Sequence, residues 1–474
     1  MLDNIKVPLV VDLDGTLIQT DTLLELLLAL IKKTPWIIFL LPVWLLRGKA
    51  YFKYAVANRV ELNPALLPYH QAFLNYLQQQ KQHGRRLILA TAANERIAHK
   101  IADYLGLFTT VLASDEKNNL VGARKLVAIK QHCDAFVYAG NEANDLPIWR
   151  AATAIIIISR SPRLLKQVQQ LHIPIEYQCI TPLFQWQTVM AALRMHQWGK
   201  NILIFVPLLT AYKFTNLSLF FLLIAGFFAL NLCASSGYLI NDLFDLTTDR
   251  QHARKSTRPF ASGALPLVMG FYAIPLLLIT SFILAFYLST LFALFLATYF
   301  VLTMSYTFYF KKIVLVDVIL LALFYVLRII MGGVVVQVPL SEWLLAFSLF
   351  FFLSLAFVKR VSELQTLRSA NQLMTVGRGY LADDLEQIMI FGTCSGYIAI
   401  LIFALFINSA SIITLYHSPQ WLWLCCPLLL YWISRIWLLT HRGFMHDDPV
   451  LFAIKDKMSY VVGFFILILL WLAK

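Results

Sequence analysis

The sequence predicts two parts of different fold class: an α/β domain with a parallel sheet and a helical cap, followed by an all-α transmembrane bundle. Apolar residues make up 59% of the 474 residues and charged residues only 14%, whereas a soluble globular chain is near 45–50% apolar and about 25% charged. Polar and apolar stretches mix up to about residue 190, and long apolar runs follow one another beyond about 200. The composition therefore excludes a disordered protein and argues against a wholly soluble enzyme.

We place the first domain at residues 1–185, on the basis of three apolar strands that each end in polar side chains. Residues 7–11 form the first strand and lead into Asp12 and Asp14, and Gly15 breaks the chain just after them. The second strand, 86–91, ends at Thr91. The carboxyl end of a parallel sheet is where α/β active sites lie. The third strand, 135–140, is preceded by Lys125 and followed by Asn141 and Asp145.

The 59 residues from 22 to 80 lie between the first two strands and predict a helical cap. Within them, residues 36–46 form an apolar run that is too short to span a bilayer. A span here would also separate Asp12 from Thr91 across the membrane. Two interpretations remain: the core of the cap, or a helix at the membrane interface with Trp36 and Trp44 at the headgroups. We favour the second interpretation, because an apolar cap suits a lipid-borne substrate.

The DLDGTL segment that begins at Asp12, with the later motifs in order, resembles the haloacid dehalogenase-like phosphatases, particularly the phosphoserine-phosphatase-like branch. The resemblance covers about 1–175 and implies a Rossmann-like α/β fold. Asp12 is then the nucleophile that forms an aspartyl-phosphate, and Asp14 is the general acid/base. The family usually has Gly-Asp where this chain has Gly-Asn, so either an active phosphatase or a degenerate domain is expected. The resemblance implies that Thr91 and Lys125 hold phosphoryl oxygens, and that Asp12, the Asp14 carbonyl, Asn141 and Asp145 hold Mg²⁺.

The second domain, 190–474, contains nine apolar runs of nearly membrane-spanning length. The odd-numbered connecting loops contain only Lys213 as a basic residue, and the even-numbered loops are basic. The positive-inside rule then places the even loops and the N-terminal domain in the cytoplasm of a bacterial-type inner membrane. The predicted helices are 198–213, 217–240, 267–287, 289–308, 313–333, 342–358, 386–408, 419–440 and 451–473, and the basic residues of the even loops are Arg250, Arg254, Lys255, Arg258, Lys311, Lys312, Lys359, Arg360, Arg368, Arg378, Arg442, Lys455 and Lys457.

Composition also bounds the partners. In a membrane chain the net charge of +13 reflects cytoplasmic loops, so no nucleic-acid partner is expected. The six cysteines contain no CxxC pair and predict neither a zinc site nor a disulfide framework. The N-terminus lacks the basic start and long apolar run of a signal peptide.

Three carboxylates, those of Asp242, Asp245 and Asp249, follow the second predicted membrane helix at offsets of 3 and 7 and would share one helical face. Such carboxylates repel one another and are costly to desolvate at a membrane boundary unless a cation is bound. Mg²⁺ that bridges them to a diphosphate is the favoured interpretation. A solvated acidic helix end is the alternative.

The segment from Asn241 to Asp249, an NDxxDxxxD pattern, resembles the first aspartate motif of the UbiA-type intramembrane prenyltransferases. Their fold, a ring of nine helices around a lipid-open cavity, agrees with the helix count. The family opens with RPxQWxKN, and this chain has Met195 in place of the proline. The resemblance implies Mg²⁺ at Asn241 and the three aspartates, with Asp242 and Asp245 catalytic, and substrate contacts from Lys200, Asn201, Arg258, Lys311 and Lys312.

The branch is indicated by residues 358–364, where aromatic prenyltransferases of this superfamily carry a second acidic motif. Here Lys359 and Arg360 precede Glu363, and two cations with one acid suit direct phosphate contacts better than a second metal. The pattern resembles the polyprenyl-phosphate phosphoribosyltransferases, in which one Mg²⁺ holds the donor diphosphate. An ordinary positive-inside loop is the alternative. Arg328 lies inside the fifth predicted helix and is expected to face the cavity or a partner.

The favoured function is a membrane transferase that uses Mg²⁺-diphosphate chemistry on a polyprenyl lipid, with phosphoribosyl transfer to a polyprenyl phosphate preferred. The N-terminal domain would dephosphorylate the product, or would act on an unrelated soluble metabolite. The expected partners are a polyprenyl substrate, a diphosphate-bearing donor and membrane lipids. Prenylation of an aromatic acceptor and a membrane scaffold with a silent phosphatase domain are the alternatives. The last basic loop, with His441, His446, Asp447 and Asp448, is either a metal-binding cap or a solvated turn.

Overall fold

The computed structural model describes residues 7–159, 161–180, 185–252, 254–369, 378–409, 412, 416–445 and 449–474. The chain divides into two compact units. The first contains Met1–Arg194 and Tyr238–Pro275, and the second contains Met195–Gly237 and Leu276–Lys474. The last loop residues expected to bind metal or form a turn, His446, Asp447 and Asp448, lie outside the described residues.

The first unit is built on a six-stranded sheet, in which every pair of neighbouring strands is parallel. The strand order is β3-β2-β1-β4-β5-β6, with crossovers on both sides of β1. The three expected strands are present as β1, β2 and β4, and they are neighbours, so the expected α/β class is confirmed. The strands are β1 Leu9–Val11, β2 Leu87–Asn94, β3 Thr110–Ser114, β4 Val137–Gly140, β5 Ala154–Ser159 and β6 Ile175–Ile180.

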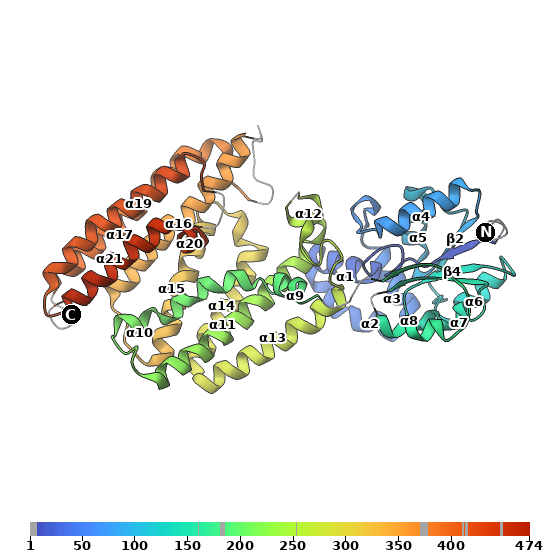
Figure 1. Cartoon of the computed structure of the whole chain (residues 1–474), viewed down its shortest axis with the longest axis horizontal. Helices are drawn as coiled ribbons and strands as arrows, with labels where there is room; N and C mark the ends of the chain where they lie inside the picture. The colour runs from blue at the N-terminus through green and yellow to red at the C-terminus, as the bar shows by residue number, and fades with distance from the viewer. Residues whose placement is uncertain are drawn as a thin grey trace. The chain divides into compact units, whose positions relative to one another are not determined.

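Alternate side chains of each strand enter different cores, as a pleated strand requires. Leu9 and Val11 pack with helices α4 (Gln71–Gln82) and α5 (Glu95–Leu105) on one face. Val10 packs on the other face with α6 (Ala123–Lys130), α7 (Leu146–Trp149) and α8 (Pro162–Gln169). Figure 1 shows the two helical layers with the strands between them. This doubly wound arrangement brings the ends of β1, β2 and β4 to one edge of the sheet.

The expected cap is helical. It contains α1 (Thr22–Lys33), the 3-10 helix η2 (Pro35–Phe39), α2 (Leu41–Leu46), α3 (Lys49–Ala57) and the 3-10 helix η3 (Pro64–Leu66), and α4 follows. The prediction that Trp36 and Trp44 both face headgroups is wrong for Trp44. Trp44 is buried in the core beneath the Arg59 guanidinium, whereas 78% of Trp36 is exposed.

Among the residues that the structure describes, seven elements are long and apolar enough to cross a membrane. They are Leu217–Phe244 (α11), Leu267–Leu288 (α13), Thr290–Phe308 (α14), Val316–Val336 (α15), Glu342–Ser369 (α16), Ala382–Ile407 (η8, Ala382–Asp384, and α17, Leu385–Ile407) and Pro419–His441 (η9, Pro419–Leu424, and α19, Cys425–His441). The 17-residue α21 (Lys457–Ala473) is a shorter apolar helix after α20 (Pro449–Lys455). Short connecting helices are α9 (Trp186–Ala192), α12 (Leu246–Gln251), η6 (Lys255–Thr257) and η7 (Phe310–Lys312).

The expected count of nine spans is therefore not confirmed within the described ranges. The first expected span, 198–213, is instead the 3-10 helix η5 (Met195–Phe205) followed by the five-residue α10 (Val206–Thr210). Pro207 stands in the first turn of α10, where proline is tolerated but cannot continue the hydrogen bonding of a preceding helix. In the second unit, α15, α16, α17, α19 and α21 share one apolar core.

Candidate functional sites

The two carboxylates at the end of β1 are separated by a tight turn. Asp12 follows β1 and donates its backbone N–H to Ala139 O on β4, at 3.0 Å. Gly15 has φ +74°, a left-handed conformation that favours glycine. The Asp14 carboxylate accepts hydrogen bonds from the N–H and hydroxyl of Thr22, at 2.9 and 3.2 Å. The turn thus fixes both acids at the carboxyl edge of the sheet.

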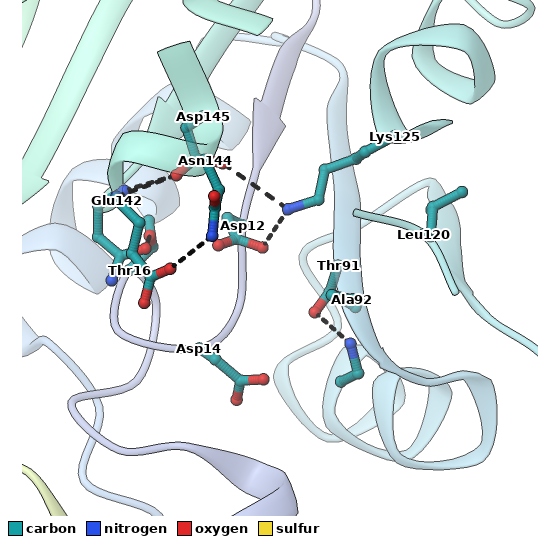
Figure 2. Close-up of polar contacts among 12 residues, drawn as sticks. Asp12, Asp14, Thr16, Thr91, Ala92, Leu120, Lys125, Glu142, Asn144 and Asp145 are labelled. Atoms are coloured by element: carbon teal, nitrogen blue, oxygen red, sulfur yellow. Dashed lines mark hydrogen bonds and ion pairs between the residues drawn. The ribbon is translucent and has the colours of Figure 1, made fainter. Parts of the chain in front are cut away.

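Lys125 is the cation of this site. It is buried on α6, and its Nζ lies 2.8 Å from Asp12 Oδ1 and 3.9 Å from Asp145 Oδ1. Figure 2 shows Lys125 reaching between the two carboxylates. Its ammonium also donates to the Tyr138 hydroxyl at 3.1 Å. The predicted residues Asp12, Lys125 and Asp145, from three separate segments, are therefore in one cluster.

Asp145 orders the loop after β4. Its Oδ1 accepts from the Tyr138 hydroxyl at 2.8 Å, and its Oδ2 accepts from the backbone N–H groups of Asn141 and Glu142, at 3.0 and 3.1 Å. Three donors therefore surround this carboxylate. Its direct contribution to a metal stays a prediction.

A cavity of about 180 Å³ opens over these groups. Asp12, Asp14, Thr91, Lys125 and Asn141 line it, so the predicted site residues of the first domain surround one space. The sequence analysis missed three charged lining residues: Asp21, directly before the cap, Lys53, within it, and Glu142, in the loop after β4. Lys53 donates to Ala92 O at 2.6 Å and to Asn119 Oδ1 at 2.9 Å, and so ties α3 to the end of β2. The sequence signal of Asp21 and Lys53 is only their position beside or within the cap, and that of Glu142 is its place next to Asn141.

The electrostatics give the two β1 carboxyls different properties. Burial raises the pKa of Asp12 to about 6, although the Lys125 ammonium acts to lower it. Burial and the nearby Asp21 carboxylate raise the pKa of Asp14 well above its ordinary value. Burial alone lowers the pKa of Lys125, but Asp12 and Asp145 outweigh it, and this pKa lies above its ordinary value. An ionised Asp12 beside a protonated Asp14 is the arrangement that a nucleophile and a general acid require.

The donor set of this cavity fits a magnesium ion. Carboxylate, amide and backbone oxygens are the ligands that Mg²⁺ prefers. A Cβ on Gly15 would lie 2.1 Å from Asn141 Nδ2, so glycine is what lets Asn141 lie against the turn that carries Asp12 and Asp14. Among the described residues, no group of three His, Cys, Asp or Glu side chains is gathered around one point. Asn141 is neutral where the family usually has an aspartate, so a metal site here has one negative charge fewer.

Replacing Asn141 by aspartate is expected to lower the Mg²⁺ concentration needed for half-maximal phosphate release by about tenfold, because it adds a charged ligand. The measurement is hydrolysis of p-nitrophenyl phosphate by the full-length protein at increasing Mg²⁺ concentrations. Asn75→Asp is the matched control, because it adds the same charge at an exposed position of α4 that does not line the cavity. If both variants need as much Mg²⁺ as the parent, Asn141 is not a ligand.

The aspartate segment of the membrane domain differs from the expected single helix. Helix α11 ends at Phe244, Asp245 is the N-cap residue of α12, and Asp249 lies within α12. Backbone hydrogen bonds from Asp245 N to Asn241 O and from Asp249 N to Asp245 O nevertheless preserve a helical turn, at 3.0 and 2.8 Å. Asp242 and Asp249 therefore still converge on one partner, the Arg258 guanidinium.

Arginines neutralise this acidic segment. Arg258 lies 3.1 Å from Asp242 Oδ1 and 2.6 Å from Asp249 Oδ2, and Arg194 also pairs with Asp242. Asp245 points to a different cation, because its Oδ1 lies 3.0 Å from Lys32 Nζ on α1. Asn241 Nδ2 lies 3.5 Å from Asp242 Oδ1. Carboxylates beside arginine and lysine side chains are the residue types that a Mg²⁺-diphosphate needs.

The cations predicted from the 358–364 segment lie in the second unit and differ in their surroundings. Arg360 is fully buried, and its guanidinium lies 2.8 Å from Asp317 Oδ2. It also pairs with Glu363, which accepts from Arg378 at 2.7 Å, and it lies over the Tyr380 ring. Lys359 is half-buried. The geometry gives Arg360 an internal ion pair, and phosphate contacts from either residue stay a prediction.

Substitutions of the two neighbouring cations are expected to affect different properties, protein stability for Arg360 and donor binding for Lys359. Arg360→Ala leaves Asp317 buried without its cation and is expected to cost about 3–5 kcal/mol of stability. Lys359→Ala is expected to leave stability unchanged and to raise the donor concentration needed for transfer by roughly 10- to 150-fold, the equivalent of a lost charge-assisted contact of about 1.5–3 kcal/mol. Thermal unfolding in detergent and donor titration separate the two effects. If the Lys359→Ala variant binds donor like the parent, the basic residues of this segment are only those of an ordinary positive-inside loop.

The other predicted contacts of the second unit are dispersed. Asn201, on η5, is buried, and its side chain bonds Arg328 and Asn231, at 2.5 and 2.6 Å. Arg328 also donates to the Tyr299 hydroxyl at 3.2 Å, so its expected interior partner is present. Lys200 is half-buried on η5, and Lys311 and Lys312 lie on η7.

Comparison with known proteins gives the class of both domains. The sequence model of the UbiA prenyltransferase family matches residues 202–465, and that of haloacid dehalogenase-like hydrolases matches 9–150. The chain therefore belongs to the UbiA prenyltransferase family and carries an N-terminal haloacid dehalogenase-like domain. It is a multi-pass membrane enzyme, a transferase joined to a hydrolase-type domain.

Three relatives show how far the similarity extends. An uncharacterized protein of Sinorhizobium fredii, y4nM, is 36% identical over 97% of this chain and 89% of its own length. The nodulation protein NoeC of Azorhizobium caulinodans is 32% identical over 58% of this chain and 90% of its own length. The decaprenyl-phosphate phosphoribosyltransferase of Mycolicibacterium smegmatis is 26% identical over 57% and 87%. A solved structure of a UbiA homolog from Archaeoglobus fulgidus bound to DMAPP and Mg²⁺ has a TM-score of 0.46 at 15% identity, over 60% of this chain and 99% of that one.

Proposed function

We propose that this protein transfers a phosphoribosyl group from phosphoribosyl diphosphate to a polyprenyl phosphate, and that its N-terminal domain removes the 5-phosphate from the lipid-linked product. The observation that carries the proposal is the assembled Asp12, Lys125 and Asp145 cluster in a chain whose membrane domain is similar to decaprenyl-phosphate phosphoribosyltransferases. Lys359, where aromatic prenyltransferases have a second acidic motif, supports the donor assignment.

In the transfer step, the bond between ribose C1 and the diphosphate breaks, and a lipid phosphate oxygen forms the new bond to C1. Bound Mg²⁺ would stabilise the charge of the departing diphosphate. Asn241, Asp242, Asp245 and Asp249 would hold it. Arg194 and Arg258 pair with the aspartates and would exchange these carboxylates for diphosphate oxygens when the donor binds. Lys200, Lys311, Lys312 and Lys359 each carry one positive charge that suits a phosphate oxygen, and they are the proposed substrate contacts of the second unit.

In the hydrolytic step, the Asp12 carboxylate attacks the 5-phosphorus and the bond to the ribose oxygen breaks. Asp14 gives its proton to that oxygen, and water then releases phosphate from the aspartyl-phosphate. Lys125 and Thr91 hold the phosphoryl oxygens. Mg²⁺ at Asp12, the Asp14 carbonyl and Asn141 would neutralise the charge of the phosphate, and the raised pKa of Asp14 keeps its proton available.

A donor labelled with ¹⁴C in the ribose and ³²P in the 5-phosphate tests both steps in the full-length protein with polyprenyl phosphate. We expect ¹⁴C in the lipid and ³²P released as inorganic phosphate, whereas the Asp12→Asn control retains both labels in the lipid. Equal ³²P to ¹⁴C ratios for parent and control would contradict the coupling. Absence of ¹⁴C from the lipid would contradict phosphoribosyl transfer, and labelled polyprenyl diphosphate with an aromatic acceptor then tests the other branch.

A further inference from the structure

The cap exposes a continuous apolar surface between residues 35 and 46, which we call the 35–46 surface. Half or more of the side chains of Trp36, Phe39, Leu45 and Leu46 is exposed to solvent, up to 89% for Leu46. Ile38, Leu40 and Val43 are also exposed. Elsewhere in the described part of residues 7–180, exposed large apolar side chains occur singly, at Tyr104, Val121 and Val127. A contiguous patch of this kind marks an interaction surface.

The fold holds this surface outward by two anchors. Ile37 and Trp44 are buried in the core of the first domain, and the Arg59 guanidinium lies 4.4 Å from the Trp44 ring centroid. Pro35 and Pro42 begin the two short helices that carry the segment, η2 and α2. The segment is thus a structured element whose remaining apolar side chains face away from the core. These exposed apolar side chains do not contribute to the core of the domain, so their exposure needs a reason other than folding.

The charged residues within and beside the segment in the sequence are of one sign. Lys32, Lys33, Arg47 and Lys49 flank the apolar residues and are exposed. No aspartate or glutamate occurs between residues 32 and 49. A rim of cations around an apolar face matches anionic lipid headgroups above acyl chains. The same rim would repel a second copy of the surface.

The N-terminal end of the surface is bonded to the end of a membrane span. Lys32 Nζ donates to the carbonyl of Phe244, the last residue of α11, at 2.7 Å. In the same compact unit, Glu25 on α1 forms a buried ion pair with Arg250 on α12, with N–O distances of 2.6 and 2.8 Å. The helix that leads into the 35–46 surface is therefore bonded to the end of α11, a helix long and apolar enough to cross a membrane.

We propose that the 35–46 surface inserts into the headgroup and upper acyl region of the membrane that the chain crosses. Trp36, Phe39 and Leu46 enter the lipid, and Lys33, Arg47 and Lys49 contact anionic headgroups, while Lys32 stays bonded to the end of α11. The partner is the lipid bilayer itself. The contact fixes the cap at the membrane surface, whatever substrate the domain hydrolyses.

The test uses the full-length protein in vesicles of equal parts phosphatidylcholine and phosphatidylglycerol. A photo-reactive benzoylphenylalanine replaces Phe39 in one sample and Tyr104 in another, because 72% and 55% of these aromatic side chains are exposed in the same domain. After irradiation, we expect roughly tenfold more lipid attached at position 39 than at position 104. Hydrolysis of p-nitrophenyl phosphate by both samples confirms that the domain is folded.

Equal lipid attachment at the two positions overturns the proposal, and so does cross-linking of position 39 mainly to a second copy of the chain. A second variant set tests the charges: Arg47→Ser with Lys49→Ser is expected to reduce lipid attachment at position 39 several-fold in anionic vesicles. The matched pair Arg86→Ser with Lys100→Ser, exposed on the same domain outside the surface, is expected to leave it unchanged. A reduction as large in the matched pair would show that net charge, and not the surface, governs the contact.

Discussion

Replacing Asp12 by asparagine is expected to lower phosphate release by about 10⁴- to 10⁶-fold, the scale on which removing a nucleophile acts. The change keeps the shape of the side chain and removes the attacking oxygen. Lys125 retains Asp145 as an acidic neighbour at 3.9 Å, so the domain is expected to fold. The measurement is the rate of p-nitrophenyl phosphate hydrolysis. Asp103→Asn, at an exposed position of α5, is the control.

The pH dependence checks the same assignment. Because burial raises the pKa of Asp12 to about 6, the carboxyl is protonated below that pH and cannot attack phosphorus. Hydrolysis by the parent protein should therefore fall as the pH drops through about 6 at low Mg²⁺, and a bound cation should move that limb to lower pH. Hydrolysis by Asp12→Asn at more than about a hundredth of the parent rate would show that another group is the nucleophile.

The phosphatase-type site could be predicted because its chemistry follows the strands. Asp12 and Asn141 directly follow β1 and β4, and Thr91 lies in the second half of β2, so their convergence required only the order of parallel strands. Lys53 and Asp21 could not be found this way. Asp21 reaches the cavity from the residue before the cap and Lys53 from within it, and the path of the cap depends on how Ile37 and Trp44 enter the core. Trp44 shows the same limit, since a tryptophan in an apolar run gives no sign of which side it faces.

The sequence was sufficient to predict the class of the membrane domain, but not which of its charged side chains pair with one another. Hydropathy located the apolar segments, but a run such as 198–213 does not reveal a change from a 3-10 helix to a short α-helix at Pro207. Arg360 was assigned to a phosphate, yet it pairs with Asp317, 43 positions earlier in the sequence. An acid inside an apolar segment needs a partner, and Asp317 therefore carried a usable signal. Which of several cations meets it is decided by helix packing.

Replacing Asp242 by asparagine, or Asp245 by asparagine, is expected to lower kcat/KM for transfer by at least about 10³-fold, equivalent to ~4 kcal/mol of lost transition-state stabilisation. Asp242 is almost fully buried and accepts from two arginines. Asp245 is half-buried and pairs with Lys32. When either carboxylate is removed, fewer charged oxygens remain to bind Mg²⁺. The net positive charge of the neighbouring arginines and lysine increases, and we expect these cations to bind the diphosphate without orienting it for transfer.

The chain supplies its own control for these two variants. Release of phosphate from p-nitrophenyl phosphate at Asp12 should continue at the parent rate, because the cavity around Asp12 includes neither Asp242 nor Asp245 among its lining residues. Asp383→Asn, an exposed acid outside both sites, should leave both activities unchanged. If either variant turns over the donor in Mg²⁺ like the parent, that aspartate is not a ligand. Loss of both activities together would instead indicate unfolding. The Glu25–Arg250 ion pair joins α1 to α12, next to the aspartates, so a variant that disturbs the fold there should unfold at a lower temperature in a thermal denaturation experiment.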